Sequence, residues 1–335
     1  MLPRLHYYLF LLLSNAILEC IAAGELLEYF KKEVAKIPNL EVHQQTDPDN
    51  DEYTIENALV GEGYDGYVRR VKHKTTGIEY ARKEVFFSDL KVEKSVDRIL
   101  FEIKTYSLCR DSEDIVHLQE VYYDKLRIFI VLEYMSGETL QKYINDNGGK
   151  IADVSKVKRL LKPIANGIKI LHHHKIMWRN LKPDNILLDA SGRPKISDMG
   201  FAAEAKESTH VFGTPYYIAP EMIKRTGYNK EIDVWSLGVM VVYLITGHYI
   251  FYPGKKQMQN AIAEYKQTNG KLPNKRAENA LIQNEYYNNV LNKEIKSKTG
   301  ITDQNAAEFA EWILEREPSN RPTANAVAGH SFLSV

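Results

Sequence analysis

Apolar and polar residues alternate in short runs along the segment that follows residue 52. Five runs have the length and the β-branched or aromatic content of strands, at 54–60, 66–74, 77–85, 118–124 and 126–133. Between the third run and the fourth, residues 92–109 carry apolar positions at helical spacing, namely Val96, Ile99, Leu100 and Ile103. The pattern therefore predicts a small lobe of five strands and one helix at 53–135.

Beyond Gly137 the apolar spacing becomes helical. Helices are expected at 139–145, 153–173, 233–246, 256–268 and 304–315. Residues 270–300 are rich in Asn and Lys, which predicts surface loops and short helices. The expected fold class is α+β, with a small β-rich lobe and one main helix, followed by a larger helical lobe at 136–335.

Residues 24–52 predict a short helix and a polar linker ahead of the first lobe. The helix is expected over 25–37, where Leu26, Leu27, Phe30 and Val34 share one face, and Pro38 ends it. The linker at 46–51 consists of turn-forming residues.

Residues 1–23 have the composition of a secretory signal peptide. Arg4 gives a basic start, 7–18 is a short apolar run, and small residues follow at 20–24. The run is too short to span a bilayer comfortably, so cleavage near Ala23 is favoured over an anchor, and no stable membrane span is expected in the mature chain. The expectation is a secreted or secretory-pathway protein. The alternative is an apolar helix that packs on the domain of a cytoplasmic protein.

Composition removes several classes of protein from consideration. Apolar residues make up 44% of the 335 positions, which is enough for a large core. Lys+Arg and Asp+Glu balance at 44 each, whereas nucleic-acid-binding proteins usually carry a basic excess, so no nucleic-acid partner is expected. The two cysteines, Cys20 and Cys109, exclude a disulfide framework. Consecutive histidines at 172–174 point in three directions on a helix, which favours packing over metal ligation.

A glycine-rich hairpin is the first sign of chemistry. Gly61, Gly63 and Gly66 would let the backbone approach phosphate groups closely, although this pattern alone is weak. A lysine follows on the third expected strand, at Lys83, and Glu102 lies on the expected helix, where it could pair with that lysine. With these residues the chain resembles the protein kinase family.

Further motifs extend the resemblance from residue 53 to residue 332. In order they are the catalytic-loop-like 178–185, the Asp-Met-Gly at 198–200, the Gly-Thr-Pro to Ala-Pro-Glu segment at 213–221, the Asp-x-Trp-Ser-x-Gly at 233–238, and Arg321. Several motifs in the family's order make a chance match negligible. Lys182 is the feature that resembles serine/threonine rather than tyrosine kinases.

The resemblance implies that ATP and Mg²⁺ are cofactors and that each matching residue has a role. Lys83, oriented by Glu102, would hold the α- and β-phosphates under the glycine-rich hairpin, and Asn185 and Asp198 would hold the metal. Lys182 would steady the γ-phosphate. The remaining roles are adenine contacts from the backbone of Glu133 and Met135, a sandwich of the ring by Val68, Ala81 and Leu187, Leu132 at the back of the pocket, and a structural ion pair of Glu221 with Arg321.

The chain departs from the family at the catalytic position. Asn180 stands where an active kinase has the aspartate that accepts the proton of the substrate hydroxyl, and an amide cannot take up a proton at neutral pH. Trp178 replaces a histidine and Met199 replaces a phenylalanine, both in packed positions. Glu62 and Asp65 add carboxylates to the hairpin that would cover the phosphates.

Three functions follow from these residues. The preferred one is a serine/threonine-kinase-like protein that binds ATP and Mg²⁺, transfers phosphate poorly and acts through a protein partner, as a pseudokinase does. The second is an active kinase that phosphorylates protein substrates despite Asn180. The third is a fold that binds no nucleotide. Arg179 is expected either to pair with a phosphate on Ser208 or Thr209 or to bind backbone carbonyl groups only.

Overall fold

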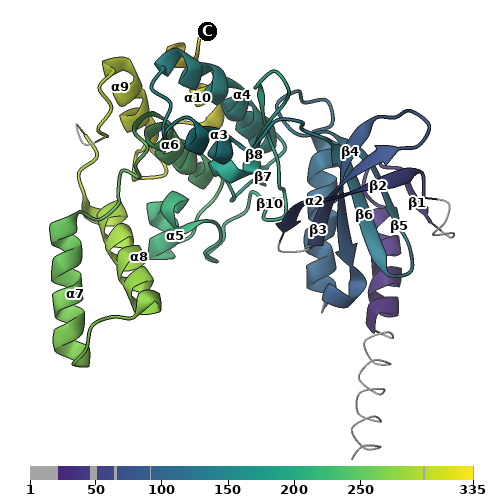
Figure 1. Cartoon of the computed structure of the whole chain (residues 1–335), viewed down its shortest axis with the longest axis horizontal. Coiled ribbons are helices and arrows are strands. Elements are labelled where there is room, and N and C mark those ends of the chain that lie inside the picture. The colour runs from purple at the N-terminus through teal and green to yellow at the C-terminus, as the bar shows by residue number, and fades with distance from the viewer. Residues whose placement is uncertain (1–21, 46–50, 64–65, 91, 297–298, 335) are drawn as a thin grey trace, which may run out of the picture. The chain divides into compact units, whose positions relative to one another are not determined.

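The computed structural model describes residues 22–45, 51–63, 66–90, 92–296 and 299–334, and Figure 1 shows its helices and strands. The chain forms two compact units, divided between Met135 and Ser136. No helix within the described ranges is long and apolar enough to cross a membrane.

The N-terminal unit is built on a six-stranded sheet. Its strands lie in the order β1-β5-β6-β4-β3-β2, and all neighbours are antiparallel except β1 and β5. Their bounds are β1 (Val42–Gln44), β2 (Tyr53–Gly63), β3 (Gly66–His73), β4 (Glu79–Phe86), β5 (Leu118–Tyr123) and β6 (Arg127–Glu133).

The sheet buries side chains on both faces, because successive residues of a strand point to opposite sides. On β6, Ile128 and Ile130 join one hydrophobic cluster, whereas Phe129 and Val131 join another with Tyr122. The first cluster also holds the apolar face of α2 (Glu93–Leu108) and the short 3₁₀-helix η2 (Phe87–Asp89). The five predicted strands and the helix are present within a few residues of their expected bounds.

One strand of this sheet was not expected from the sequence. Residues 42–44 form β1, which pairs in parallel with β5. Three residues are too few for a strand pattern to stand out, and their partners lie almost 80 positions further along the chain. The pairing is therefore set by tertiary contacts rather than by local periodicity.

The C-terminal unit is mainly helical, as expected. Its helices are α3 (Leu140–Asp146), α4 (Val154–His173), α5 (Pro220–Lys224), α6 (Glu231–Thr246), α7 (Lys255–Asn269), α8 (Lys275–Asn292), α9 (Gln304–Ile313) and α10 (Ala324–Ala328). Short strands and 3₁₀-helices lie between them, namely β7 (Ile176–Met177), η3 (Pro183–Asn185), β8 (Ile186–Leu188), β9 (Pro194–Ile196), β10 (Ala203–Glu204), η4 (Pro215–Tyr217) and η5 (Ser331–Leu333). The pairs β8–β9 and β7–β10 are antiparallel.

The expectation of loops and short helices at 270–300 was wrong, because α8 runs through most of this segment. The Asn274 side chain accepts a hydrogen bond from the backbone N–H of Ala277 and so caps the start of the helix. Tyr286 and Val290, one turn apart, are fully buried. The many Asn residues give the segment a low helix propensity. The burial of Tyr286 and Val290 stabilises the helix enough to offset that low propensity.

Candidate functional site

The glycine-rich hairpin joins β2 to β3 in the N-terminal unit. Gly63 pairs with Gly66 at its narrow end. A side chain at Gly66 would overlap the backbone carbonyl oxygen of Glu84 on the neighbouring strand, so only glycine fits there. Asp65 lies outside the described residues, as does the side chain of Glu62.

Lys83 and Glu102 form the predicted ion pair. The Lys83 Nζ lies 2.9 Å from Oε1 and 2.7 Å from Oε2 of Glu102, and both side chains are buried. Val68 lies opposite Lys83 across β3 and β4, and Ala81 precedes it on the same face. Desolvation offsets most of the attraction in a buried pair, so the bond chiefly fixes where the ammonium group lies.

The residue before Lys83 points to the other face of the sheet. Arg82 is buried and its guanidinium lies 2.6 Å from Asp51 and 2.8 Å from Glu84, with a further hydrogen bond of 2.9 Å to the Tyr122 hydroxyl. Two adjacent cations are thus neutralised separately on opposite sides of β4. Apart from the alternation of side chains along a strand, no pattern in the sequence predicts this second network.

The end of β6 carries the residues expected to face adenine. Ala81 lies opposite Leu132, and Tyr80 lies opposite Glu133. The backbone N–H of Glu133 donates to the carbonyl oxygen of His117 at 2.9 Å, which anchors the end of the strand. Met135, two residues further on, is buried.

In the C-terminal unit a buried carboxylate holds the start of the catalytic-loop-like segment. The backbone N–H groups of Trp178 and Arg179 donate to Oδ2 and Oδ1 of Asp233 on α6, at 2.9 and 2.8 Å. Nε2 of His172 lies 2.9 Å from the same carboxylate, so this histidine belongs to the packing of the loop. Asp233 was predicted only as part of a structural motif, and the structure gives it this anchoring function.

Asn180 lies at the centre of the predicted catalytic and metal residues of this unit. Its Nδ2 donates to Oδ2 of Asp198 at 2.8 Å, and Nδ2 of Asn185 donates to its backbone carbonyl oxygen at 2.8 Å. An ionised carboxylate only accepts hydrogen bonds, so the NH₂ end of the Asn180 amide must face Asp198. Asn180 is 5% exposed and therefore well fixed by these contacts.

Trp178 fixes Asp198 from the other side. The indole ring is completely buried, and its Nε1–H donates to the backbone carbonyl oxygen of Asp198 at 2.9 Å. Asp198 adopts a left-handed backbone conformation with φ of 56°. Its Oδ1 accepts the backbone N–H of Gly200 at 3.2 Å. The indole at position 178 is thus accommodated in the core and bonded to the residue that is expected to bind the metal.

Arg179 is engaged by the chain itself. Its Nε donates to the carbonyl oxygen of Phe201 at 2.7 Å, and its guanidinium lies 4.5 Å from the centre of the Phe212 ring. The backbone of Ser208 pairs with Tyr228. Arg179 thus binds one backbone carbonyl group of the chain. Its pairing with a phosphate on Ser208 or Thr209 stays a prediction, and Thr209 is exposed.

The remaining predicted residues have clear positions in the same unit. Lys182 directly precedes η3, which contains Asn185, and Leu187 lies in β8. The structural pair is present, with Nη1 of Arg321 2.8 Å from Oε1 of Glu221, both buried.

The described side chains are compatible with a hard cation and a nucleotide. Asp198 offers carboxylate oxygens and Asn185 an amide oxygen, and both residues bond to Asn180. In the other unit, Lys83 offers an ammonium group that Glu102 holds in place. One oxygen of Asp198 already accepts the Asn180 amide, which leaves fewer lone pairs for a metal than a free carboxylate has.

Comparison with known proteins matches these features to one family. Residues 54–333 match the family model of the protein kinase domain. The chain is 34% identical over 197 residues to CBL-interacting serine/threonine-protein kinase 8 of Arabidopsis thaliana. The aligned region covers 57% of this chain and 44% of that protein.

Two further relatives are similar. Rhodopsin kinase grk7-b of Danio rerio is 32% identical over 63% of this chain and 39% of its own length. Serine/threonine-protein kinase PAK 5 of Rattus norvegicus is 27% identical over 85% of this chain and 36% of its own length. The chain thus matches less than half the length of these relatives. It belongs to the protein kinase family, and its similarity is to serine/threonine kinases.

Proposed function

We propose that this protein is a serine/threonine-kinase-like protein that binds ATP with Mg²⁺, transfers phosphate poorly and acts through contacts with other proteins. Protein kinase domains in general use ATP and Mg²⁺. In this protein we expect ATP and Mg²⁺ binding to be retained. Phosphate transfer is expected to be weak because Asn180 stands at the position of the catalytic base.

The observation that carries the proposal is the hydrogen bond from Asn180 to Asp198. A base at this position would have to accept the proton of an incoming hydroxyl group. The side-chain NH₂ of Asn180 instead donates a hydrogen bond to Asp198, and the amide oxygen that remains is a neutral acceptor. Asn180 can therefore orient a hydroxyl group but cannot carry its proton away.

Residues in each of the two units support nucleotide binding. Lys83 would meet the α- and β-phosphates, and its ion pair with Glu102 fixes the ammonium group. Asp198 and Asn185 would hold the magnesium ion, which neutralises phosphate charge when bound. Lys182 would contact the γ-phosphate, and the backbone at Glu133 and Met135 would contact adenine.

Nucleotide binding is tested by thermal melting with and without ATP and Mg²⁺. We expect ATP with Mg²⁺ to raise the melting temperature, because a ligand that binds only the native state stabilises it by mass action. The Lys83→Ala variant should lose most of this shift, whereas Lys72→Ala, which removes an exposed lysine on β3, should keep it. No shift at millimolar ATP would favour the fold that binds no nucleotide.

Phosphate transfer is tested with the Asn180→Asp variant. We expect the natural protein to transfer phosphate about 10²-fold more slowly than the variant, which is the lower end of a general-base contribution. ATP affinity should be similar in the two proteins. Equal rates would mean that the chain is an active kinase, the second candidate. If neither protein is active, other departures such as Trp178 also disable the site.

A further inference from the structure

Residues 22–44 lie outside the segment that matches the kinase domain, yet they are part of the core of the N-terminal unit. Residues 22–34 form a helix, shown in purple in Figure 1. Its apolar side chains recur every three or four residues and lie on one face, with exposed fractions between 0 and 8% for Leu26, Leu27, Phe30 and Val34. We call residues 22–44 the N-terminal brace.

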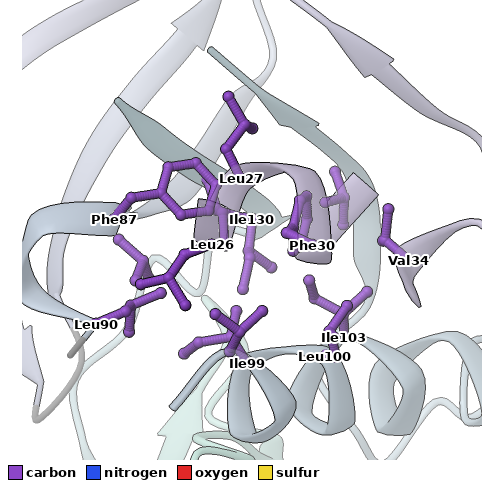
Figure 2. Packing of buried hydrophobic residues seen from close by; sticks show 14 of the residues in the cluster. Leu26, Leu27, Phe30, Val34, Phe87, Leu90, Ile99, Leu100, Ile103 and Ile130 are labelled. Carbon is purple, nitrogen blue, oxygen red and sulfur yellow. The ribbon is translucent and has the colours of Figure 1, made fainter. Parts of the chain in front are cut away.

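The apolar face of the brace packs against α2 and against the segment that leads into it. Figure 2 shows Leu26, Leu27 and Phe30 in one cluster with Ile99, Leu100 and Ile103 of α2. Phe87 and Leu90, which precede α2, belong to the same cluster. The Phe30 ring makes edge-to-face contacts with Phe87 and Tyr123, at centroid distances of 6.0 and 5.7 Å.

Polar contacts join the brace to both ends of α2. Near the start of α2, the Tyr29 hydroxyl donates to Oδ1 of Asp97 at 2.6 Å. Near its end, Oγ of Ser107 donates to the carbonyl oxygen of Pro38 at 3.1 Å. Just beyond it, Nη1 of Arg110 donates to the carbonyl oxygen of Asn39 at 3.2 Å. The brace thus follows α2 along its whole length.

The last part of the brace is fixed to the sheet. Val42 lies beside Val121 and Gln44 beside Tyr123, in the parallel pairing of β1 with β5. The backbone N–H of Gln45 donates to the carbonyl oxygen of Tyr123 at 2.8 Å and extends the pairing by one residue. One end of the brace is therefore bonded to the sheet while its helix packs on α2.

From this arrangement we infer that the brace is a positioning element, which holds α2 against the sheet and thereby keeps Glu102 within hydrogen-bonding distance of Lys83. Ile99 and Ile103, which pack in the cluster with the brace, flank Glu102 on α2, so a shift of α2 would move the carboxylate with them. The effect on nucleotide binding rests on the function proposed above. The effect on α2 does not.

The test is a matched pair of substitutions in the full-length protein. Phe30→Leu weakens the packing of the brace on α2, and Phe129→Leu makes the same change in the separate cluster on the opposite face of the sheet. Hydrogen exchange of residues 93–108 is measured without nucleotide. In Phe30→Leu we expect exchange about tenfold faster, the factor that about 1.4 kcal/mol makes in an equilibrium constant. In Phe129→Leu we expect no such change.

A second variant covers the case in which Phe30→Leu does not fold. Tyr29→Phe keeps the apolar face and removes only the hydroxyl group that bonds to Asp97, and we expect exchange at the start of α2 to rise about fivefold. Equal exchange of α2 in Phe30→Leu and Phe129→Leu, or unchanged exchange in Tyr29→Phe, would overturn the inference.

Melting temperatures with and without ATP distinguish a failure of this inference from a failure of the proposed function. If the natural protein shows an ATP-dependent rise in melting temperature, Phe30→Leu should reduce it more than Phe129→Leu does. If the two variants reduce it equally, the brace does not act on Glu102. If the natural protein shows no rise, the proposed function fails, and the exchange measurement still decides whether the brace holds α2.

Discussion

At the scale of single residues, Asn180 changes the electrostatics around Asp198. An amide that donates to a carboxylate brings a partial positive charge to Oδ2, where a second carboxylate would bring a negative one. Trp178 bonds to the backbone of the same residue. Asp198 and its backbone therefore accept hydrogen bonds from Asn180 and Trp178. If position 180 were an aspartate, a cation would be needed to offset the repulsion between the two carboxylates.

Replacing Asn180 should make the stability of the protein depend on Mg²⁺. In Asn180→Asp, two carboxylate groups would lie where the present donor and acceptor are 2.8 Å apart, and like charges at such a distance repel. We expect the variant to melt below the natural protein in EDTA and to gain more from added Mg²⁺, without nucleotide. Melting curves in EDTA and in Mg²⁺ measure both effects.

The control for this experiment is Asn260→Asp, at an exposed position in the middle of α7. It adds the same charge on α7, outside the hydrogen bonds of Asn180 and Asp198, so its melting temperature should respond to Mg²⁺ as that of the natural protein does. A similar response of Asn180→Asp would contradict the role given to the Asn180 amide.

Cys109 should make the protein less stable at alkaline pH. Burial raises the pKa of the Cys109 thiol to about 12, whereas an unfolded chain ionises its thiol near pH 8.5. The native state therefore keeps a proton that the unfolded state releases, and the free energy of unfolding falls as pH rises between these values. Between pH 7 and pH 10 the loss should reach about 2 kcal/mol.

Denaturant unfolding of the natural protein and of Cys109→Ala at the two pH values isolates this contribution, since all other groups are shared. The natural protein should lose more stability than the variant over the interval. If the two lose the same amount, the thiol is not shielded from water in the way its buried position indicates.

At the scale of elements, α6 anchors the loop that carries Asn180. The helix is apolar around most of its circumference and buried, and Asp233 in its first turn accepts two backbone N–H groups from 178–179. A carboxylate accepts hydrogen bonds at both of its oxygens, whereas an amide accepts at its single oxygen and donates from its NH₂ group. The position of the loop therefore depends on a charge inside the core rather than on residues of the loop itself.

We expect Asp233→Asn to destabilise the protein by about 2 kcal/mol, because hydrogen bonds to a charged group would be lost and a buried donor left unpaired. Chemical denaturation measures the change. Asp303→Asn is the matched control, since Asp303 caps the start of α9 with an accepted hydrogen bond from Ala306 and Asn caps helices equally well. Comparable losses in the two variants would show that Asp233 has no special function.

At the scale of the whole molecule, the kinase domain is preceded by the N-terminal brace and by residues 1–21, which lie outside the described residues. The expected signal peptide ends near Ala23, within the first turn of the brace helix and ahead of its buried residue Leu26. We propose on the basis of this composition that the chain enters the secretory pathway. Cleavage at that point would leave Leu26, Leu27, Phe30 and Val34 on the mature protein.

N-terminal sequencing of protein recovered from a secretory host tests this proposal. The expected first residue lies next to Ala23, and the recovered protein should melt at the same temperature as a chain expressed from Gly24 onward. Recovery of protein that still begins with Met1 would contradict cleavage and favour the alternative of an apolar helix that packs on the domain.

The sequence alone determined the family, the division into a β-rich and a helical lobe, and most element bounds. Strand and helix periodicities are local, so they identify α2 and the strands of the first unit without any knowledge of their partners. The order of the motifs along the chain likewise identified Lys83, Glu102 and Glu221 as residues of interest before their contacts were known. The pairing of Lys83 with Glu102 was predictable because motif spacing places one on a strand and the other on the adjacent helix.

Tertiary structure alone decided which groups those residues contact. β1 forms because residues 42–44 pair with β5, and α8 is stabilised because Tyr286 and Val290 are buried in the core. The direction of the Asn180 amide is set by Asp198, 18 positions away, and the packing of Phe30 by residues more than 50 positions away. Sequence patterns record local preference, whereas hydrogen bonds and burial depend on neighbours that only the folded chain brings together.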